Sequence, residues 1–195
     1  MHVARASSWP EADALFRSDR RWLGSDDAYS VPLGPDRILW LFGDTFIGDG
    51  SRASAAFVHN SIGIQRGADP SAASIMFRWG LGPDAFFRTG DRSWYWPLHG
   101  VRTEEGLLLF MMRVRSPIGG TGTVEEWRRL GSLGFFEVFG WTALLISNPD
   151  ADPGEWEVGV AEEQEHDIVM GASVVADNGS HLIYGWDHEK RIVLA

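Results

Sequence analysis

Short apolar runs, each closed by a turn containing glycine, proline, asparagine or aspartate, recur along almost the whole chain. Ten Trp, eleven Phe and 23 Gly belong to this pattern, because large rings pack well on a pleated sheet and glycine supplies the positive φ of tight turns. Helical periodicity is confined to residues 10–16, with a competing helical turn at 124–130. We therefore expect an all-β chain. The expected strands are 28–33, 37–42, 60–65, 75–79, 93–101, 107–115, 134–147, 156–160, 170–176, 181–186 and 191–194.

One unit occurs three times: a strand, a turn with glycine or an acidic residue, and an apolar strand that ends in an aromatic. The copies SVPLGPDRILWLF, PLHGVRTEEGLLLF and ASVVADNGSHLIY end at Phe42, Phe110 and Tyr184, which are 68 and 74 residues apart. A unit of about 70 residues with about four strands fits a blade of a β-propeller. The alternative is that ordinary hairpins of an all-β protein line up here by chance.

Length limits the number of such blades. The 195 residues hold fewer than three units, whereas closed propellers typically have 4 to 8 blades. We expect residues 1–195 to form one incomplete propeller-like domain of about two and a half to three blades, after a short lead-in at 1–21, and we interpret the chain as C-terminally truncated. A complete chain would need a second copy or another closure. Self-association through an open β-edge is also expected, because unpaired strands expose backbone donors and acceptors.

The net charge and the composition of the chain limit the partners, location and cofactors that we expect. Lys and Arg number 17 against 27 Asp and Glu, a formal charge of −10, and no basic run offsets it, so we expect no nucleic-acid or membrane partner. Without cysteine, disulfides and thiolate chemistry are excluded. No signal peptide is visible, so a cytoplasmic location is the default. No cofactor or metal is expected, because residues 150–154 begin like a calcium loop but lack its ligand order.

The first hairpin places two carboxylates opposite each other. If its loop, 34–36, is centred on residue 35, Val31 faces Leu39 and Asp26 faces Asp44. Cross-strand neighbours lie roughly 4.5 to 5.5 Å apart, where like charges are destabilising. Two facing carboxylates are therefore expected only where a bound cation, a shared proton or a catalytic role accounts for the repulsion.

Two other interpretations of these acidic residues stay open. A register slip of one residue would replace Asp26 by Asp27 as the partner. Alternatively, Asp44 caps a turn while Asp26 and Asp27 only solvate a loop. If the pair is catalytic, glycoside hydrolysis suits it, because that reaction needs one carboxylic acid to protonate the leaving oxygen and one carboxylate as nucleophile or base. The sequence does not decide which residue has which role, or whether the reaction retains or inverts.

Three segments resemble a known family. RWLGSDDAYSVPL at 21–33, ILWLFGDTFIG at 38–48 and FVHNSI at 57–62 are similar to the opening of domain of unknown function family 4185, with weaker similarity over much of the remaining chain. Its relatives are five-bladed β-propellers, and some are classed as endo-acting D-arabinofuranosidases of glycoside hydrolase family 183. In those members the catalytic acids correspond to Asp26 and Asp44. Asp27 departs from the pattern, because relatives often have a small residue there.

The resemblance implies a glycoside hydrolase that acts on a furanose polysaccharide, most specifically D-arabinan, with a polysaccharide or oligosaccharide as partner. Asp27, His59, Asn60 and Trp96 are the expected substrate-binding residues, since polar groups bind sugar hydroxyls and an indole face packs against a sugar ring. Ordinary structural roles, a satisfied loop histidine and a core tryptophan, compete with these assignments. The alternative function is a β-propeller that binds carbohydrate or a partner protein without turnover.

Overall fold

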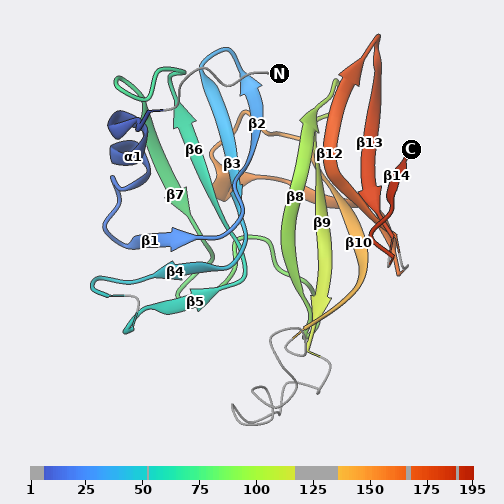
Figure 1. Cartoon of the computed structure of the whole chain (residues 1–195), viewed down its shortest axis with the longest axis horizontal. Helices are drawn as coiled ribbons and strands as arrows, with labels where there is room; N and C mark the ends of the chain where they lie inside the picture. Colours follow the sequence, from blue (N-terminus) through green and yellow to red (C-terminus); the bar gives the residue numbers. More distant parts are fainter. Residues whose placement is uncertain (1–6, 52, 117–135, 166–167, 188) are drawn as a thin grey trace.

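The computed structural model describes residues 7–51, 53–116, 136–165, 168–187 and 189–195, and these form four antiparallel sheets with one short α-helix and one 3-10 helix (Figure 1). Every sheet begins and ends on an edge strand, so none of them closes into a barrel within the described residues. The prediction of an all-β chain is confirmed. No helix in this described part is long and apolar enough to span a membrane.

Two four-stranded sheets make up most of the structure, with strand orders β2-β3-β6-β7 and β11-β10-β9-β8. Two three-stranded sheets have the orders β1-β4-β5 and β12-β13-β14. The elements are α1 (Pro10–Phe16), β1 (Trp22–Ser25), β2 (Tyr29–Gly34), β3 (Arg37–Phe42), β4 (Thr45–Ile47), β5 (Ala56–Val58), β6 (Ser61–Arg66), β7 (Ser74–Arg78), β8 (Trp94–Arg102), β9 (Leu107–Arg115), β10 (Glu137–Ile146), the short 3-10 helix η1 (Pro153–Glu155), β11 (Val158–Gln164), β12 (Val169–Asp177), β13 (Ser180–Trp186) and β14 (Ile192–Leu194).

The expected elements are present, with bounds that differ by a few residues. The three copies of the repeated hairpin become β2–β3, β8–β9 and β12–β13, and each lies in a different sheet. Three strands were not predicted, β1, β4 and β5, because runs of three or four residues are too short to show a period of two. The competing helical turn at 124–130 lies outside the described residues.

Strand β9 lies between two buried cores. Leu109 and Met111 belong to the cluster between the two large sheets, whereas Phe110 belongs to the cluster shared with β12. Successive side chains of a strand point to opposite faces, so a strand covered on both faces needs apolar residues at every position. This explains the continuous apolar run at the start of β9, which alternation alone would not predict.

Two side chains form hydrogen bonds between parts of the structure that are distant in sequence. The Nδ1 atom of His99 in β8 accepts the backbone N–H of Val174 in β12 over 2.9 Å, and its Nε2 atom lies 3.3 Å from the carbonyl oxygen of Ser30 in β2. The guanidinium of Arg37 donates to two carbonyl oxygens of the loop 149–151, each over 2.9 Å. These bonds connect the first large sheet to the loop 149–151, and β8 to both β2 and β12.

Candidate active site

The candidate site lies where two paired strands leave the first large sheet and enter the small sheet β1-β4-β5. Val31 pairs with Leu39 as predicted, and β1 and β4 continue in the same register. Between the two ladders, the N–H of Asp26 donates to the carbonyl oxygen of Asp44 over 3.1 Å. The backbone apposition of the two acidic residues is therefore present, at the point where the sheets separate.

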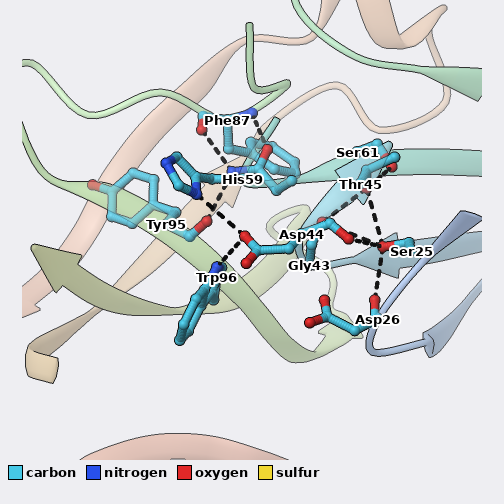
Figure 2. A network of polar contacts seen from close by, with 11 residues as sticks. Ser25, Asp26, Gly43, Asp44, Thr45, His59, Ser61, Phe87, Tyr95 and Trp96 are labelled. Atoms are coloured by element: carbon cyan, nitrogen blue, oxygen red, sulfur yellow. Dashed lines mark hydrogen bonds and ion pairs between the residues drawn. The ribbon is translucent and has the colours of Figure 1, made fainter. Parts of the chain in front are cut away.

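Small hydroxyl side chains hold this turn in place (Figure 2). Thr45 and Ser61 are fully buried, and the two hydroxyl oxygens lie 2.8 Å apart. The hydroxyl of Thr45 also lies 2.8 Å from the carbonyl oxygen of Gly43, and that of Ser25 lies 2.7 Å from the carbonyl oxygen of Asp26. Our sequence analysis missed these residues. The signal that could have found them is a short hydroxyl residue beside a Gly-Asp turn, where it can satisfy backbone groups.

The carboxylates of Asp26 and Asp27 converge above Gly43. A Cβ atom placed on Gly43 would lie 2.6 Å from Oδ1 of Asp26 and 2.9 Å from Oδ2 of Asp27, closer than such atoms approach. Asp27 reaches this position with a φ of 53°, in the left-handed region that aspartate tolerates better than most residues. Glycine at 43 therefore leaves the space that the two carboxylates occupy, and both Asp26 and Asp27 belong to the site.

Their proximity changes the acidity of both groups. Asp26 and Asp27 are both exposed, but neighbouring atoms displace part of the water around each carboxyl group. This desolvation raises the pKa of Asp26, and the nearby negative charges of Asp44 and Asp27 raise it further. Desolvation also raises the pKa of Asp27, with a smaller contribution from Asp44. Because the charged form is disfavoured at both positions, each is a better proton donor near neutral pH than an ordinary aspartic acid.

Asp44 has a different environment, because its carboxylate turns towards the second large sheet (Figure 2). Its Oδ1 atom accepts the indole N–H of Trp96 over 2.7 Å and lies 3.2 Å from Nδ1 of His59. Among the described residues, its Oδ2 atom has no hydrogen-bond partner. The side chain is 24% exposed, so one oxygen is fixed by the protein while the other can meet a substrate.

An aromatic cluster supports His59. Its ring stacks on that of Trp94 with centroids 4.3 Å apart and an interplanar angle of 12°, and Phe57 approaches it edge-on at 5.4 Å. Trp96 in turn contacts Phe136 edge-on at 4.6 Å. The two predicted substrate-binding residues His59 and Trp96 are thus brought to Asp44, where they position a carboxylate oxygen.

Asn60 lies beneath this cluster. It is fully buried, its amide N–H groups donate to the carbonyl oxygens of Phe87 and Tyr95 over 2.9 Å each, and its side-chain oxygen accepts the N–H of Phe87 over 2.7 Å. All of its polar atoms are used by the backbone. The structure therefore places Asn60 as a support for the loop before β8, away from the position expected for a residue that contacts sugar.

The arrangement suits proton transfer combined with nucleophilic or base chemistry. Two carboxyl groups with raised pKa and one carboxylate with a free oxygen meet at one turn. Such unequal environments separate the acid and base roles of chemically identical groups. Within the ranges that the structure describes, no three acidic, histidine or cysteine side chains form a group that could hold a metal ion.

A family model described as a domain of unknown function, DUF5005, matches residues 11–133. The resemblance to domain of unknown function family 4185 is therefore wrong, and nothing supports membership of glycoside hydrolase family 183. The expected furanose substrate and D-arabinan rested on that resemblance and lose their support with it. The physical reason is that Gly-Asp-Thr is a short motif whose glycine and threonine are explained by the turn itself, so it does not specify a family.

Comparison with solved structures supports the fold. A crystal structure described as that of a putative hydrolase from Bacteroides ovatus ATCC 8483 superposes with a TM-score of 0.70 at 15% sequence identity. The match covers 95% of this chain and 51% of that chain, so this chain spans about half the length of that protein. No curated protein matches the sequence.

Proposed function

The chain belongs to the family described as domain of unknown function DUF5005, and we propose that it is a hydrolase that cleaves glycosidic bonds with Asp44 and Asp26. The observation that carries the proposal is the meeting of Asp26, Asp27 and Asp44 at one turn in unequal environments. The description of the similar crystal structure as a hydrolase is compatible with this assignment.

Glycoside hydrolysis requires a protonated carboxyl group and an unprotonated one on either side of the scissile bond. We assign the proton donor to Asp26, because desolvation and two neighbouring charges raise its pKa, with Asp27 as the second candidate. We assign the nucleophile or general base to Asp44, because Trp96 and His59 hold its Oδ1 atom while no described residue bonds its Oδ2 atom. The donor gives its proton to the leaving oxygen, and Asp44 acts on the anomeric carbon or on a water molecule.

We also propose that the sheets are blades of an incomplete β-propeller. Support comes from the three copies of the repeated hairpin, each of which lies in a different sheet. Blades of a propeller are arranged around one axis. A structure in which the sheets are not arranged around one common axis would contradict this proposal.

The function can be tested by the release of reducing ends from neutral polysaccharides and of nitrophenol from aryl glycosides. Asp44→Asn should reduce kcat about 10²- to 10⁴-fold, the usual contribution of such a group. Asp36→Asn, at the opposite end of the same hairpin, is the matched control and should be neutral. Turnover that survives Asp44→Asn, or binding of glycans without any turnover, would contradict the enzyme assignment and favour a carbohydrate-binding protein.

The leaving group separates the two carboxylate roles. A dinitrophenolate leaves without protonation, so the variant that lacks the proton donor should keep its activity on dinitrophenyl glycosides and lose it on alkyl glycosides. We expect this behaviour from Asp26→Asn. The same result with Asp27→Asn, and not with Asp26→Asn, would move the proton donor to Asp27.

A further inference from the structure

A polar cleft of about 450 Å³ opens beside the candidate site. One wall comes from the end of β5 and the start of β8, with Phe57, His59 and Trp94. The facing wall is the loop 83–93, which precedes β8. The cleft and the acid turn therefore share His59, whose Nδ1 atom contacts Asp44.

The loop wall offers both acceptors and donors to a ligand. Asp91 uses one carboxylate oxygen to accept the backbone N–H of Ser93 over 2.8 Å, and the residue remains exposed. A carboxylate has about four lone-pair positions, so acceptor sites remain. Arg88 is paired with Asp84 at 3.0 Å, but its side chain is 68% exposed and a guanidinium has five donors.

The wall formed by the end of β5 and the start of β8 adds an apolar surface and a further acceptor. Phe57 is 45% exposed although it is a large aromatic residue. Oδ1 of Asp44 accepts from Trp96, and when it also accepts from Nδ1 of His59, the neutral imidazole has its Nε2 atom left as an acceptor for a hydroxyl group. The cleft therefore combines one exposed aromatic ring with several polar side chains, which suits a ligand that carries many hydroxyl groups.

The charge of the cleft selects against anions. Asp84 and Asp91 outnumber Arg88 in its lining, Asp44 lies next to His59, and the chain as a whole carries a formal charge of −10. Uronic acids or sulfated sugars would be repelled at this surface, whereas uncharged sugars would not.

We propose that this cleft binds an uncharged glycan chain and holds the sugar units that extend from the bond at Asp44. This proposal rests on the proposed function and names its substrate class: a neutral oligosaccharide or polysaccharide longer than one sugar unit. The exposed ring of Phe57 packs against the C–H face of a sugar, and adjacent hydroxyls bridge Asp91 and Arg88.

Binding is measured by isothermal titration calorimetry with the Asp26→Asn variant, so that hydrolysis does not consume the probe. The probes are cellohexaose, xylohexaose, mannohexaose and maltohexaose, with hexagalacturonate as the anionic probe. We expect at least one neutral hexasaccharide to bind with a Kd of about 1 mM or tighter, its disaccharide to bind at least tenfold more weakly, and hexagalacturonate not to bind.

The matched variants are Asp91→Asn and Asp69→Asn, each made in the Asp26→Asn background. Both aspartates accept the N–H and the hydroxyl of the serine two residues later, but only Asp91 lines the cleft. Asp91→Asn should weaken binding at least fivefold, Arg88→Gln should do the same, and Asp69→Asn should change nothing. Thermal unfolding of each variant checks that the fold is kept.

The outcomes separate this inference from the proposed function. Failure of all four neutral hexasaccharides to bind overturns the inference, and so does binding that Asp91→Asn and Arg88→Gln leave unchanged. If bonds are hydrolysed equally fast in disaccharides and hexasaccharides, the function stands and the cleft is not a subsite. If no hydrolysis occurs but binding depends on Asp91, the cleft is a glycan-binding site and the enzyme assignment is wrong.

Discussion

Trp96 donates its indole N–H to Oδ1 of Asp44 over 2.7 Å, although the two residues are 52 positions apart. Trp96 belongs to β8 in the second large sheet, whereas Asp44 lies in the turn between β3 and β4. The direction of the carboxylate therefore depends on how one sheet packs against another. A bond of this kind, from a neutral donor to a charged acceptor, is worth about 1.5–3 kcal/mol.

Replacing Trp96 by phenylalanine keeps the ring and removes the donor. We expect Trp96→Phe to lower kcat about tenfold or more, with a smaller effect on KM, because a misplaced carboxylate impairs the reaction more than substrate binding. Trp156→Phe is the matched control, because the buried indole nitrogen of Trp156 has no hydrogen-bond partner in the described structure and the residue does not line the cleft. Steady-state kinetics of the two variants measure the difference. Equal kinetics would show that the bond to Asp44 has no functional role.

Gly43 should matter for activity more than for stability. Gly43→Ala would push its Cβ against the carboxylate oxygens of Asp26 and Asp27, which are the flexible ends of side chains and can move aside. A displacement of about 1 Å at reacting groups can cost about 10²-fold in rate. We expect a loss of that order in kcat/KM with a change of only a few degrees in Tm.

Gly34→Ala is the control for this substitution. No atom lies within 4 Å of the Cβ that it adds, at the other end of the same hairpin. Its activity should equal that of the wild type. A Gly43→Ala protein that is fully active would show that the positions of the two carboxylates are not critical.

The stability of the protein should respond to pH through Asp26. Its pKa is raised on folding, so the folded state holds the proton more tightly than the unfolded chain. The resulting stabilisation is complete below the unfolded pKa of about 3.9 and is lost as the pH rises through the folded pKa. Asp26→Asn, which carries no charge, should therefore be more stable than the wild type at pH 7, by no more than roughly 0.2–1 kcal/mol because solvent screens the repulsion at this exposed side chain. The difference should vanish near pH 3.5.

Asp69 is the control, because its pKa is lowered on folding whereas that of Asp26 is raised. Hydrogen bonds from the backbone N–H and the hydroxyl of Ser71 lower its pKa. This contribution to stability is present above the unfolded pKa and is lost as the pH falls through the folded pKa. Asp69→Asn should therefore be less stable than the wild type at pH 7. Urea unfolding at both pH values measures the two effects, and a destabilised Asp26→Asn protein at pH 7 would contradict our account of the acid turn.

Asn60 should be essential for folding. Asn60→Ala would remove the side-chain partner of two carbonyl groups and one N–H that belong to buried residues. Each such group costs about 1–3 kcal/mol, so we expect a loss of roughly 3 kcal/mol or more in the free energy of unfolding. Asn148→Ala is the matched control, because Asn148 makes two similar bonds to the backbone of residues 155 and 157 in a solvent-exposed region. Asn148→Ala should lower the free energy of unfolding by about 1 kcal/mol, as measured by urea titration.

Local rules of sequence correctly predicted the longer strands and the register of the first hairpin, but not the short strands β1, β4 and β5. Alternation with a period of two and the residues of a tight turn act between neighbours along the chain, and they placed Val31 opposite Leu39. They also brought the backbones of Asp26 and Asp44 together. The family resemblance failed because its strongest motif, at 42–45, is short, and the turn itself explains its glycine and its threonine.

The sequence by itself determined an all-β chain and a hairpin that carries two facing acidic residues. Only the tertiary structure decided that the carboxylate of Asp44 turns to Trp96 and His59, that Asp27 joins Asp26 above Gly43, and that Asn60 is buried. These outcomes depend on contacts between sheets and between loops distant in sequence. A pattern of neighbouring residues contains no information on such packing, because it arises only when separate sheets exclude water from a shared core.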